Sequence, residues 1–178
     1  MNNIMSLYPD IPSQGVPFGR LGNQRFFLQL GWQWRRAAAI TGDGTIIAPT
    51  RLMSRLFSLK SNVYKFRFNA TDATKPGPEY AGAAHLSELN YVWNNPALKA
   101  SSTDARTLVE IMSRMWVSFV GDLNPNGHGL TGVPMWETYS SNSEGEDIVF
   151  QLGSVYVEDD NWRKDGMNIL IAARERVA

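Results

Sequence analysis

The longest stretch of helical periodicity in the chain follows Thr103. Thr103-Asp104 form a predicted N-terminal cap, and Gly121 and Pro125 end the pattern. Between them, apolar residues recur every three or four positions and form one stripe: Leu108, Ile111, Met112, Met115, Trp116 and Phe119. This spacing predicts the clearest helix of the sequence.

Weaker patterns predict helices nearer the two ends of the chain. Residues 23–39 contain no proline and carry apolar side chains at helical spacing: Phe26, Phe27, Leu30, Trp34 and Ala38. Residues 161–173 show a similar pattern and are predicted as the final helix. Before Asn23, proline and glycine are so frequent that we expect an irregular segment without a helix.

A further helix is predicted after a turn at residues 42–45. It begins at Thr45 or at Ala48-Pro49, because proline is tolerated in the first helical turn. Its apolar face holds three leucines, with two arginines predicted on the outside: Leu52, Leu56, Leu59, Arg51 and Arg55. We expect this helix to have a structural role.

Two segments are rich in residues that favour β-structure. Residues 62–68 predict a strand, which a polar segment rich in proline and glycine follows at residues 69–78. Residues 147–157 contain two short β-type runs about Gly153-Ser154 and predict a hairpin. The order of helices and strands predicts α/β layering with too few strands for a closed sheet.

Composition narrows the class of protein. The chain has 178 residues, 43% of them hydrophobic, which is enough for one core and too few for two ordinary domains. Seventeen basic and 17 acidic residues give zero formal charge, so we expect no nucleic-acid partner and no polybasic membrane anchor. No apolar run approaches the roughly 18 residues of a membrane helix, and the start lacks the features of a signal peptide. The absence of cysteine excludes thiol catalysis, disulfides and cysteine-based zinc sites in this chain.

The chain has two histidines, which are the candidates for a general base near neutral pH. His85 lies in a predicted loop of small residues with a carboxylate, Glu88, three positions later. Such a loop can present a ring to a cleft, although a structural or surface histidine is the alternative. His128 lies between two glycines, for which we favour a structural role.

Several familiar motifs are absent or out of context. Residues 127–132 match the letters of a dinucleotide fingerprint, but they follow a predicted helix instead of joining a strand to a helix. None of the 15 glycines begins a Gly-x-Ser-x-Gly elbow. We therefore expect no bound cofactor or metal. The six tryptophans suggest a carbohydrate platform, but core packing is the favoured explanation.

Three segments, taken in order, resemble one family. They are residues 82–93 (Gly-Ala-Ala-His-Leu-Ser-Glu-Leu-Asn-Tyr-Val-Trp), 115–126 (beginning Met-Trp-Val-Ser-Phe) and 134–139 (Pro-Met-Trp-Glu-Thr-Tyr). Together they resemble the C-terminal third of type-B carboxylesterases, the family of cholinesterases and fungal lipases. Residues 7–10, Gly42-Asp43 and 48–51 are similar to the segment shortly after that family's acidic triad member, particularly in its fungal branch.

The resemblance implies a fold and a role for His85. The fold is α/β, the C-terminal portion of an α/β-hydrolase with an incomplete sheet, flanking helices and a C-terminal β-hairpin. Residues 1–178 would be a single partial domain lacking the N-terminal half. His85 would be the triad histidine, and Glu88 would match the family's supporting carboxylate in its His-x-x-Glu stretch. Asp43 falls after the family's acid and is expected to be a turn or cap residue.

The resemblance also implies what the chain lacks. The family orders its triad as serine, acid and histidine, and only the histidine is here, so we expect a carboxylic ester hydrolase fragment that is inactive alone. Its substrate in the full context would be a small-molecule or lipid ester. The family's Trp-Pro-x-Tyr reads Trp136-Glu137-Thr138-Tyr139 here, which removes a turn proline but no reactive group.

Other expectations accompany this hypothesis. The alternative function is a non-catalytic cholinesterase-like interaction module. The predicted strand at 62–68 would have an open edge, with apolar surface exposed. Asn69-Ala70-Thr71 is a glycosylation sequon in a predicted exposed loop, in keeping with a family that is typically secreted, although the sequence leaves the location of this chain open.

Overall fold

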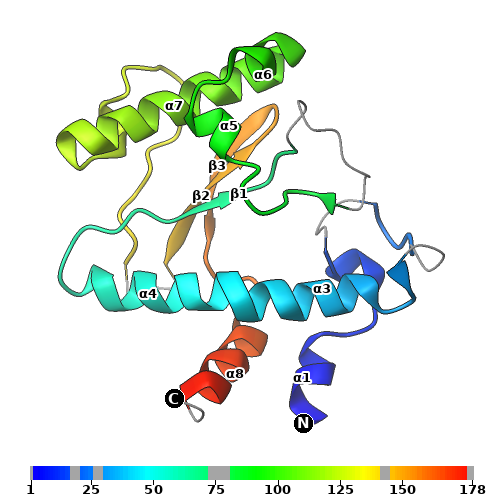
Figure 1. Ribbon diagram of the computed structural model, residues 1–178. Coiled ribbons are helices and arrows are strands. Elements are labelled where there is room, and N and C mark those ends of the chain that lie inside the picture. The colour runs from blue at the N-terminus through cyan, green and yellow to red at the C-terminus, as the bar shows by residue number, and fades with distance from the viewer. Residues whose placement is uncertain (1, 17–20, 26–29, 72–80, 141–144, 176–178) are drawn as a thin grey trace. The chain divides into compact units, whose positions relative to one another are not determined.

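The computed structural model describes residues 2–16, 21–25, 30–71, 81–140 and 145–175 (Figure 1). The chain divides into two compact units, and each is described by itself. The sheet unit comprises residues 62–139 and 146–159, and the helical unit comprises 1–61, 140–145 and 160–178. Helices and a small sheet together make this a mixed α/β structure, as the sequence predicted.

The sheet unit is built on three strands in the order β1-β2-β3. β1 (Phe66–Phe68) pairs in parallel with β2 (Glu146–Gln151), and β2 pairs with β3 (Ser154–Asp159) as an antiparallel hairpin. The predicted hairpin is confirmed, and the strand predicted over residues 62–68 is confirmed over 66–68 only. Parallel strands need a long crossover, and here it carries α5 (Leu89–Val92), α6 (Pro96–Ser101) and α7 (Thr103–Asp122).

The core of the sheet unit lies between one face of the sheet and α7. The predicted α7 stripe is confirmed: Leu108, Met112 and Met115 are almost fully buried, whereas Phe119 is 39% exposed. They pack with the aromatic residues of β1 and β2 and with the rings of Trp116 and Trp136, whose centroids lie 5.3 Å apart. The helix begins one residue earlier than predicted, because the cap is Ser102, whose side chain accepts a hydrogen bond from Ala105 N at 3.0 Å.

The other face of the sheet carries paired charges, since alternate residues of a strand point to opposite faces. Lys65 Nζ lies 2.7 and 2.6 Å from the two carboxylate oxygens of Asp147, and both side chains are 5% exposed. Arg67 makes a two-pronged contact with Glu158, with Nε 2.5 Å from Oε1 and Nη2 2.9 Å from Oε2. These pairs join β1 and the residue before it to both strands of the hairpin.

The helical unit begins with a helix that the sequence analysis did not predict. α1 spans Asn2–Leu7, and the short helix η1 spans Pro12–Gln14. The expectation of no helix before Asn23 is therefore wrong, because the breaking residues start only at Pro9 and residues 2–7 contain neither proline nor glycine. α8 (Lys164–Glu175) confirms the predicted final helix and contacts α1 and α4.

A continuous helical rod runs from α3 (Trp34–Gly42) through the π-helix η2 (Asp43–Ile47) to α4 (Ala48–Ser58), as Figure 1 shows. The predicted turn at residues 42–45 is wrong. A π-helical turn accommodates extra residues without ending the helix. The helix predicted over 23–39 is confirmed at Leu30 and from Trp34 onward, whereas residues 23–25 and 31–33 are not helical. Phe26 and Phe27 lie outside the described residues.

The buried and exposed faces of α4 differ from the prediction, which placed Arg51 outside and the leucines inside. Arg51 is fully buried, whereas Leu56 and Leu59 are 53% and 69% exposed. Arg51 Nη2 donates to Asp160 Oδ1 at 2.7 Å and to the Trp162 carbonyl at 3.1 Å. Because these partners come more than a hundred positions later, the local pattern around Arg51 gave no sign of them.

Among the described residues, none of the helices has both the length and the apolar character needed to cross a bilayer.

Candidate functional site

His85 lies in an irregular turn of the sheet unit, in the crossover between β1 and α5. Its side chain is exposed. The turn is closed by backbone hydrogen bonds from Ser87 N to Ala84 O at 3.1 Å and from Leu89 N to Leu86 O at 3.3 Å. The predicted loop of small residues is therefore confirmed, and it holds the imidazole on the surface of this unit.

The backbone at Leu86, next to His85, has a φ of +67°. Left-handed backbone is unfavourable for a branched side chain, and such strain concentrates at functional sites. Leu86 is also 54% exposed, so burial of its side chain does not compensate for the strain. The turn is thus held in an uncommon conformation directly beside the candidate base.

Glu88 lies in the same turn and forms the N-terminal boundary of α5. Its carbonyl accepts hydrogen bonds from Tyr91 N at 2.9 Å and from Val92 N at 3.1 Å, and its side chain is half-buried. Across the described residues, no hydrogen bond or ion pair joins His85 to Glu88 or to any other carboxylate. The two predicted residues are therefore neighbours on one turn that are not directly bonded to each other.

His128 has the structural contact that its sequence context suggested. Its Nδ1 accepts a hydrogen bond from Leu130 N at 3.0 Å. In the neutral ring the proton must then lie on Nε2. Residues 128–132 are irregular and follow α7 and the short helix η4 (Pro125–Gly127), so the predicted loop after a helix is confirmed.

A buried charged cluster in the helical unit was missed by the sequence analysis. Asp43 is 0% exposed and accepts hydrogen bonds from Tyr8 Oη at 2.7 Å and from Arg163 Nη2 at 2.8 Å. The guanidinium of Arg163 lies over the rings of Trp162 and Tyr8, 4.8 and 5.5 Å from their centroids. Asp43 was expected to be a turn or cap residue. It occupies the C-cap position of α3 inside a continuous helix, so the predicted turn is wrong, and its side chain anchors this helix to a distant segment.

The cluster shifts the acidity of its members. Burial raises the pKa of the Asp43 carboxyl, although Arg163 and the Tyr8 hydroxyl oppose the shift. Burial and the hydrogen bond to Asp43 raise the pKa of the Tyr8 phenol well above its ordinary value. Since the carboxylate already accepts bonds from a tyrosine and an arginine, the arrangement is suited to holding segments together.

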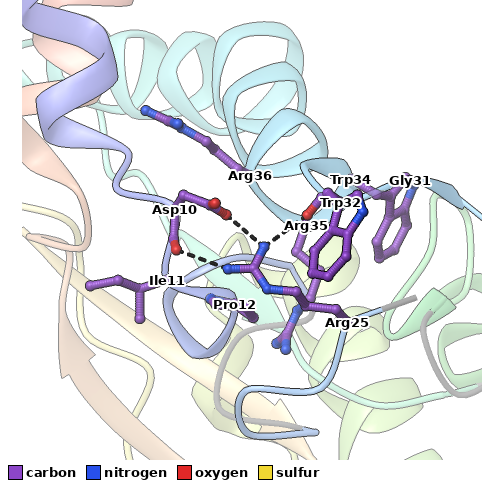
Figure 2. A pocket seen from close by; sticks show the side chains of 9 residues that line it. All are labelled: Asp10, Ile11, Pro12, Arg25, Gly31, Trp32, Trp34, Arg35 and Arg36. Carbon is purple, nitrogen blue, oxygen red and sulfur yellow. Dashed lines mark hydrogen bonds and ion pairs between the residues drawn. The ribbon is translucent and has the colours of Figure 1, made fainter. Parts of the chain in front are cut away.

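A small pocket of the helical unit is filled by protein groups. Figure 2 shows Arg25 beside Asp10 and Trp32, with Nη1 donating to Asp10 Oδ1 at 2.9 Å and to the Trp32 carbonyl at 3.0 Å. The guanidinium carbon lies 5.6 Å from the centroid of the Trp32 ring. The remaining volume is about 10 Å³, which is close to the space of one water molecule. We therefore assign no ligand to this pocket.

Within the parts of the chain that the structure describes, no three histidine, aspartate or glutamate side chains gather in a way that would hold a metal ion.

The sequon residue Asn69 directly follows β1, is half-buried, and donates from Nδ2 to Gln151 Oε1 at 2.7 Å. Ala70 is 1% exposed, so the expectation of an exposed loop at the sequon is wrong.

Comparison with known proteins identifies the family. The model of the carboxylesterase family matches residues 32–156, which include His85, Glu88 and the whole crossover. This chain belongs to the carboxylesterase family. The resemblance found from residues 82–93, 115–126 and 134–139 is thereby confirmed.

Individual carboxylesterase relatives are similar along part of their length. Lipase 4 of Diutina rugosa is 26% identical over 172 residues, which are 96% of this chain and 28% of that lipase. Acetylcholinesterase-1 of Trittame loki is 30% identical over 70% of this chain and 23% of its own length. Carboxylesterase 1C of Mus musculus is 28% identical over 55% of this chain and 18% of its own. The chain spans less than a third of the length of these relatives.

Proposed function

We propose that this chain forms the C-terminal portion of an α/β-hydrolase fold and supplies the histidine of a serine esterase. His85 is the general base, Glu88 is a supporting carboxylate, and the reaction is hydrolysis of a carboxylic ester. The observation that carries the proposal is the position of His85: a strained, exposed turn after β1, inside the region matched by the carboxylesterase family. The names of the relatives, which include a lipase and a carboxylesterase, support an ester substrate, either small or lipid.

In each half of this mechanism His85 takes one proton and gives it up again. It takes the proton of a serine hydroxyl during attack on the ester carbonyl and then gives it to the leaving alkoxide, which leaves the acyl group on the serine. It next takes a proton from the water that attacks this acyl-enzyme and returns it to the serine as the carboxylic acid leaves. The sequence contains no Gly-x-Ser-x-Gly, so the serine belongs to a part of the enzyme outside residues 1–178. Groups of a triad act as a unit, and the 178-residue chain alone is therefore expected to have no turnover.

The acid of the triad also lies outside this chain in the proposal. Asp43 is the tempting candidate inside it, but its two carboxylate oxygens accept bonds from Tyr8 and Arg163. A carboxylate that orients a histidine needs an oxygen free to accept the ring N–H. The contacts of Asp43 thus support a structural role.

Residues 1–178 are proposed to be part of one α/β domain. In the sheet of the described residues, β1 has a partner strand on one side only. A short parallel strand of this kind is usually found inside a larger, covered sheet. We expect further strands of the complete domain to pair along β1.

The test is a chimera with Lipase 4 of Diutina rugosa. This chain replaces the matching 28% of the lipase, and hydrolysis of p-nitrophenyl butyrate is measured. The chimera should be active, and His85→Ala should lower kcat by at least about a thousandfold. Glu88→Gln should lower kcat less, and His128→Ala, the matched control, should leave it unchanged. Retained activity in the His85→Ala chimera would overturn the proposal.

A non-catalytic interaction module is the second candidate, and the lack of a serine elbow in this sequence favours it. It predicts that a folded chimera is inactive, with or without His85. Circular dichroism of the same chimera separates this outcome from a failure to fold.

A further inference from the structure

The sheet unit has a groove that the proposed esterase chemistry does not use. It is bounded by the end of α5, the outer side of α7, and η4, and it has a volume of about 670 Å³. A volume of this size lies within the range of small-molecule sites. One wall is the indole of Trp93, which is 77% exposed, and the apolar side chain of Val117, 73% exposed, contributes to the lining.

Trp93 is held by a rigid base. It is the C-cap residue of α5, and its backbone N–H donates a hydrogen bond to the Leu89 carbonyl at 2.9 Å. The next residue, Asn94, fixes the turn with a φ of +55°, which asparagine tolerates better than most residues. Tyr91, two positions earlier, is fully buried and donates from its hydroxyl to the Thr71 carbonyl at 2.8 Å. The ring is therefore exposed on a support that is anchored in the core.

Polar groups line the groove together with the indole. His128 offers Nε2–H, because its Nδ1 already accepts the Leu130 N–H. Asp122 is exposed, and no ion pair to it is found among the described residues. Arg114, whose Nη2 lies 3.0 Å from Glu110 Oε1, contributes further donors. The lining thus combines an aromatic face, an acceptor and several donors.

From this arrangement we infer that the groove binds a neutral saccharide, with a pyranose ring stacked on Trp93 and its hydroxyl groups bonded to Asp122 and His128. A pyranose has an apolar C–H face and an edge of hydroxyl groups, which matches an exposed ring beside polar side chains. The positive charge of Arg114 is balanced by Glu110, so the groove has no excess positive charge for an anionic ligand. An acyl chain in this groove would leave the Asp122 carboxylate and the Nε2–H of His128 without polar partners, and this disfavours a lipid.

The test uses the 178-residue chain with methyl pyranosides of glucose, mannose, galactose and N-acetylglucosamine and their trisaccharides, plus decanoate as an acyl probe. Tryptophan fluorescence and saturation-transfer NMR report binding. At least one saccharide should give a saturable response. Trp93→Ala should abolish it, and Asp122→Asn should weaken it by about tenfold or more.

Trp32→Ala is the matched control, since Trp32 is also exposed, at 63%, but belongs to the helical unit. It should bind the saccharide like the unchanged chain, as should His85→Ala, because the groove does not depend on the esterase proposal. Thermal melts verify that each variant is folded. The inference is overturned by a flat response to every saccharide, by a response that survives Trp93→Ala, or by a response to decanoate alone.

Discussion

Two aspartates of the helical unit have opposite surroundings and opposite pKa shifts. The hydrogen bond from Arg25 is the main cause that lowers the pKa of Asp10, and Gln33 Nε2 at 2.8 Å adds to it. Burial raises the pKa of Asp43, despite its bonds to Arg163 and Tyr8. The same residue type thus stabilises the fold in different pH ranges at the two positions.

Asp10 should stabilise the protein only where it is ionised. Its pKa is lower in the folded chain than in the unfolded chain, so its contribution is present above the ordinary aspartate pKa of about 3.9. That contribution is lost as the pH falls through the lowered folded pKa. The difference in urea midpoint between the unchanged chain and Asp10→Asn should therefore shrink toward zero on acidification. A difference that grows as the pH falls would contradict this sign.

Tyr8→Phe removes a hydrogen bond to a buried carboxylate while keeping the aromatic ring. The Tyr8 hydroxyl is 2.7 Å from Asp43 Oδ2, and the free energy of unfolding should fall by about 1.5–3 kcal/mol. Urea denaturation measures the change. In an Asp43→Asn background the same substitution should cost less, because the charged acceptor is already gone. Equal costs in both backgrounds would show that the hydroxyl acts independently of Asp43.

At the scale of elements, the N-terminal cap of α7 gives a direct test. Ser102 Oγ accepts the Ala105 N–H at 3.0 Å, so Ser102→Ala should lower the free energy of unfolding by about 1 kcal/mol. Thr103→Ala is the control at the position that the sequence analysis favoured, and it should change stability by less than about 0.5 kcal/mol. Urea denaturation of both variants decides between the two caps.

The charged face of the sheet depends on the pair that joins β1 to β2. The side chains of Lys65 and Asp147 are each 5% exposed. Lys65→Met alone removes the ammonium group beside a buried carboxylate, so it should lower the free energy of unfolding by about 3–5 kcal/mol. Lys65→Met combined with Asp147→Leu should cost less than Lys65→Met alone, because no charge is then left buried without its partner. A double-mutant cycle by urea denaturation measures the coupling. If the two single substitutions change the free energy of unfolding additively, the ion pair does not contribute to stability.

Elements whose signal is local were predictable, and those that depend on distant partners were not. The α7 stripe, the strand at β1 and the hairpin follow from periodicity and turn residues that lie close together in the sequence. The neighbouring sequence of Arg51 and of Asp43 is typical of surface residues. Their burial is explained by partners far away in the sequence, Asp160 for Arg51 and Tyr8 and Arg163 for Asp43.

For the candidate site, the irregular turn around His85 was predictable from small residues and the family resemblance. The strain at Leu86 was not, because a left-handed conformation at leucine has no sequence signal. The exposure of Trp93 was also missed, since core packing was expected for the tryptophans. That expectation is right for Trp116 and Trp136 and wrong for Trp32 and Trp93.

At the scale of the whole molecule, the amount of exposed apolar surface determines how the chain should behave in solution. On α7, Val117 and Val120 are 73% and 77% exposed, and Leu123 just beyond the helix is 70% exposed. β1 is an edge strand of the described sheet. Contiguous apolar surface and an unpaired edge both favour association between copies.

We therefore expect the 178-residue chain to bind the dye ANS and to associate as its concentration rises in analytical ultracentrifugation. Val117→Lys with Val120→Lys should reduce both signals, because charge replaces the apolar residues of one helix face. Thr107→Lys adds the same charge at an exposed polar position of α7 and should change neither. The chimera with Lipase 4 should associate less than the 178-residue chain, since the proposed complete domain would pair the free edge of β1. If the isolated chain is monomeric and binds no ANS, the exposed residues are tolerated by a self-sufficient fold, and the proposal that this chain completes a larger domain loses its support.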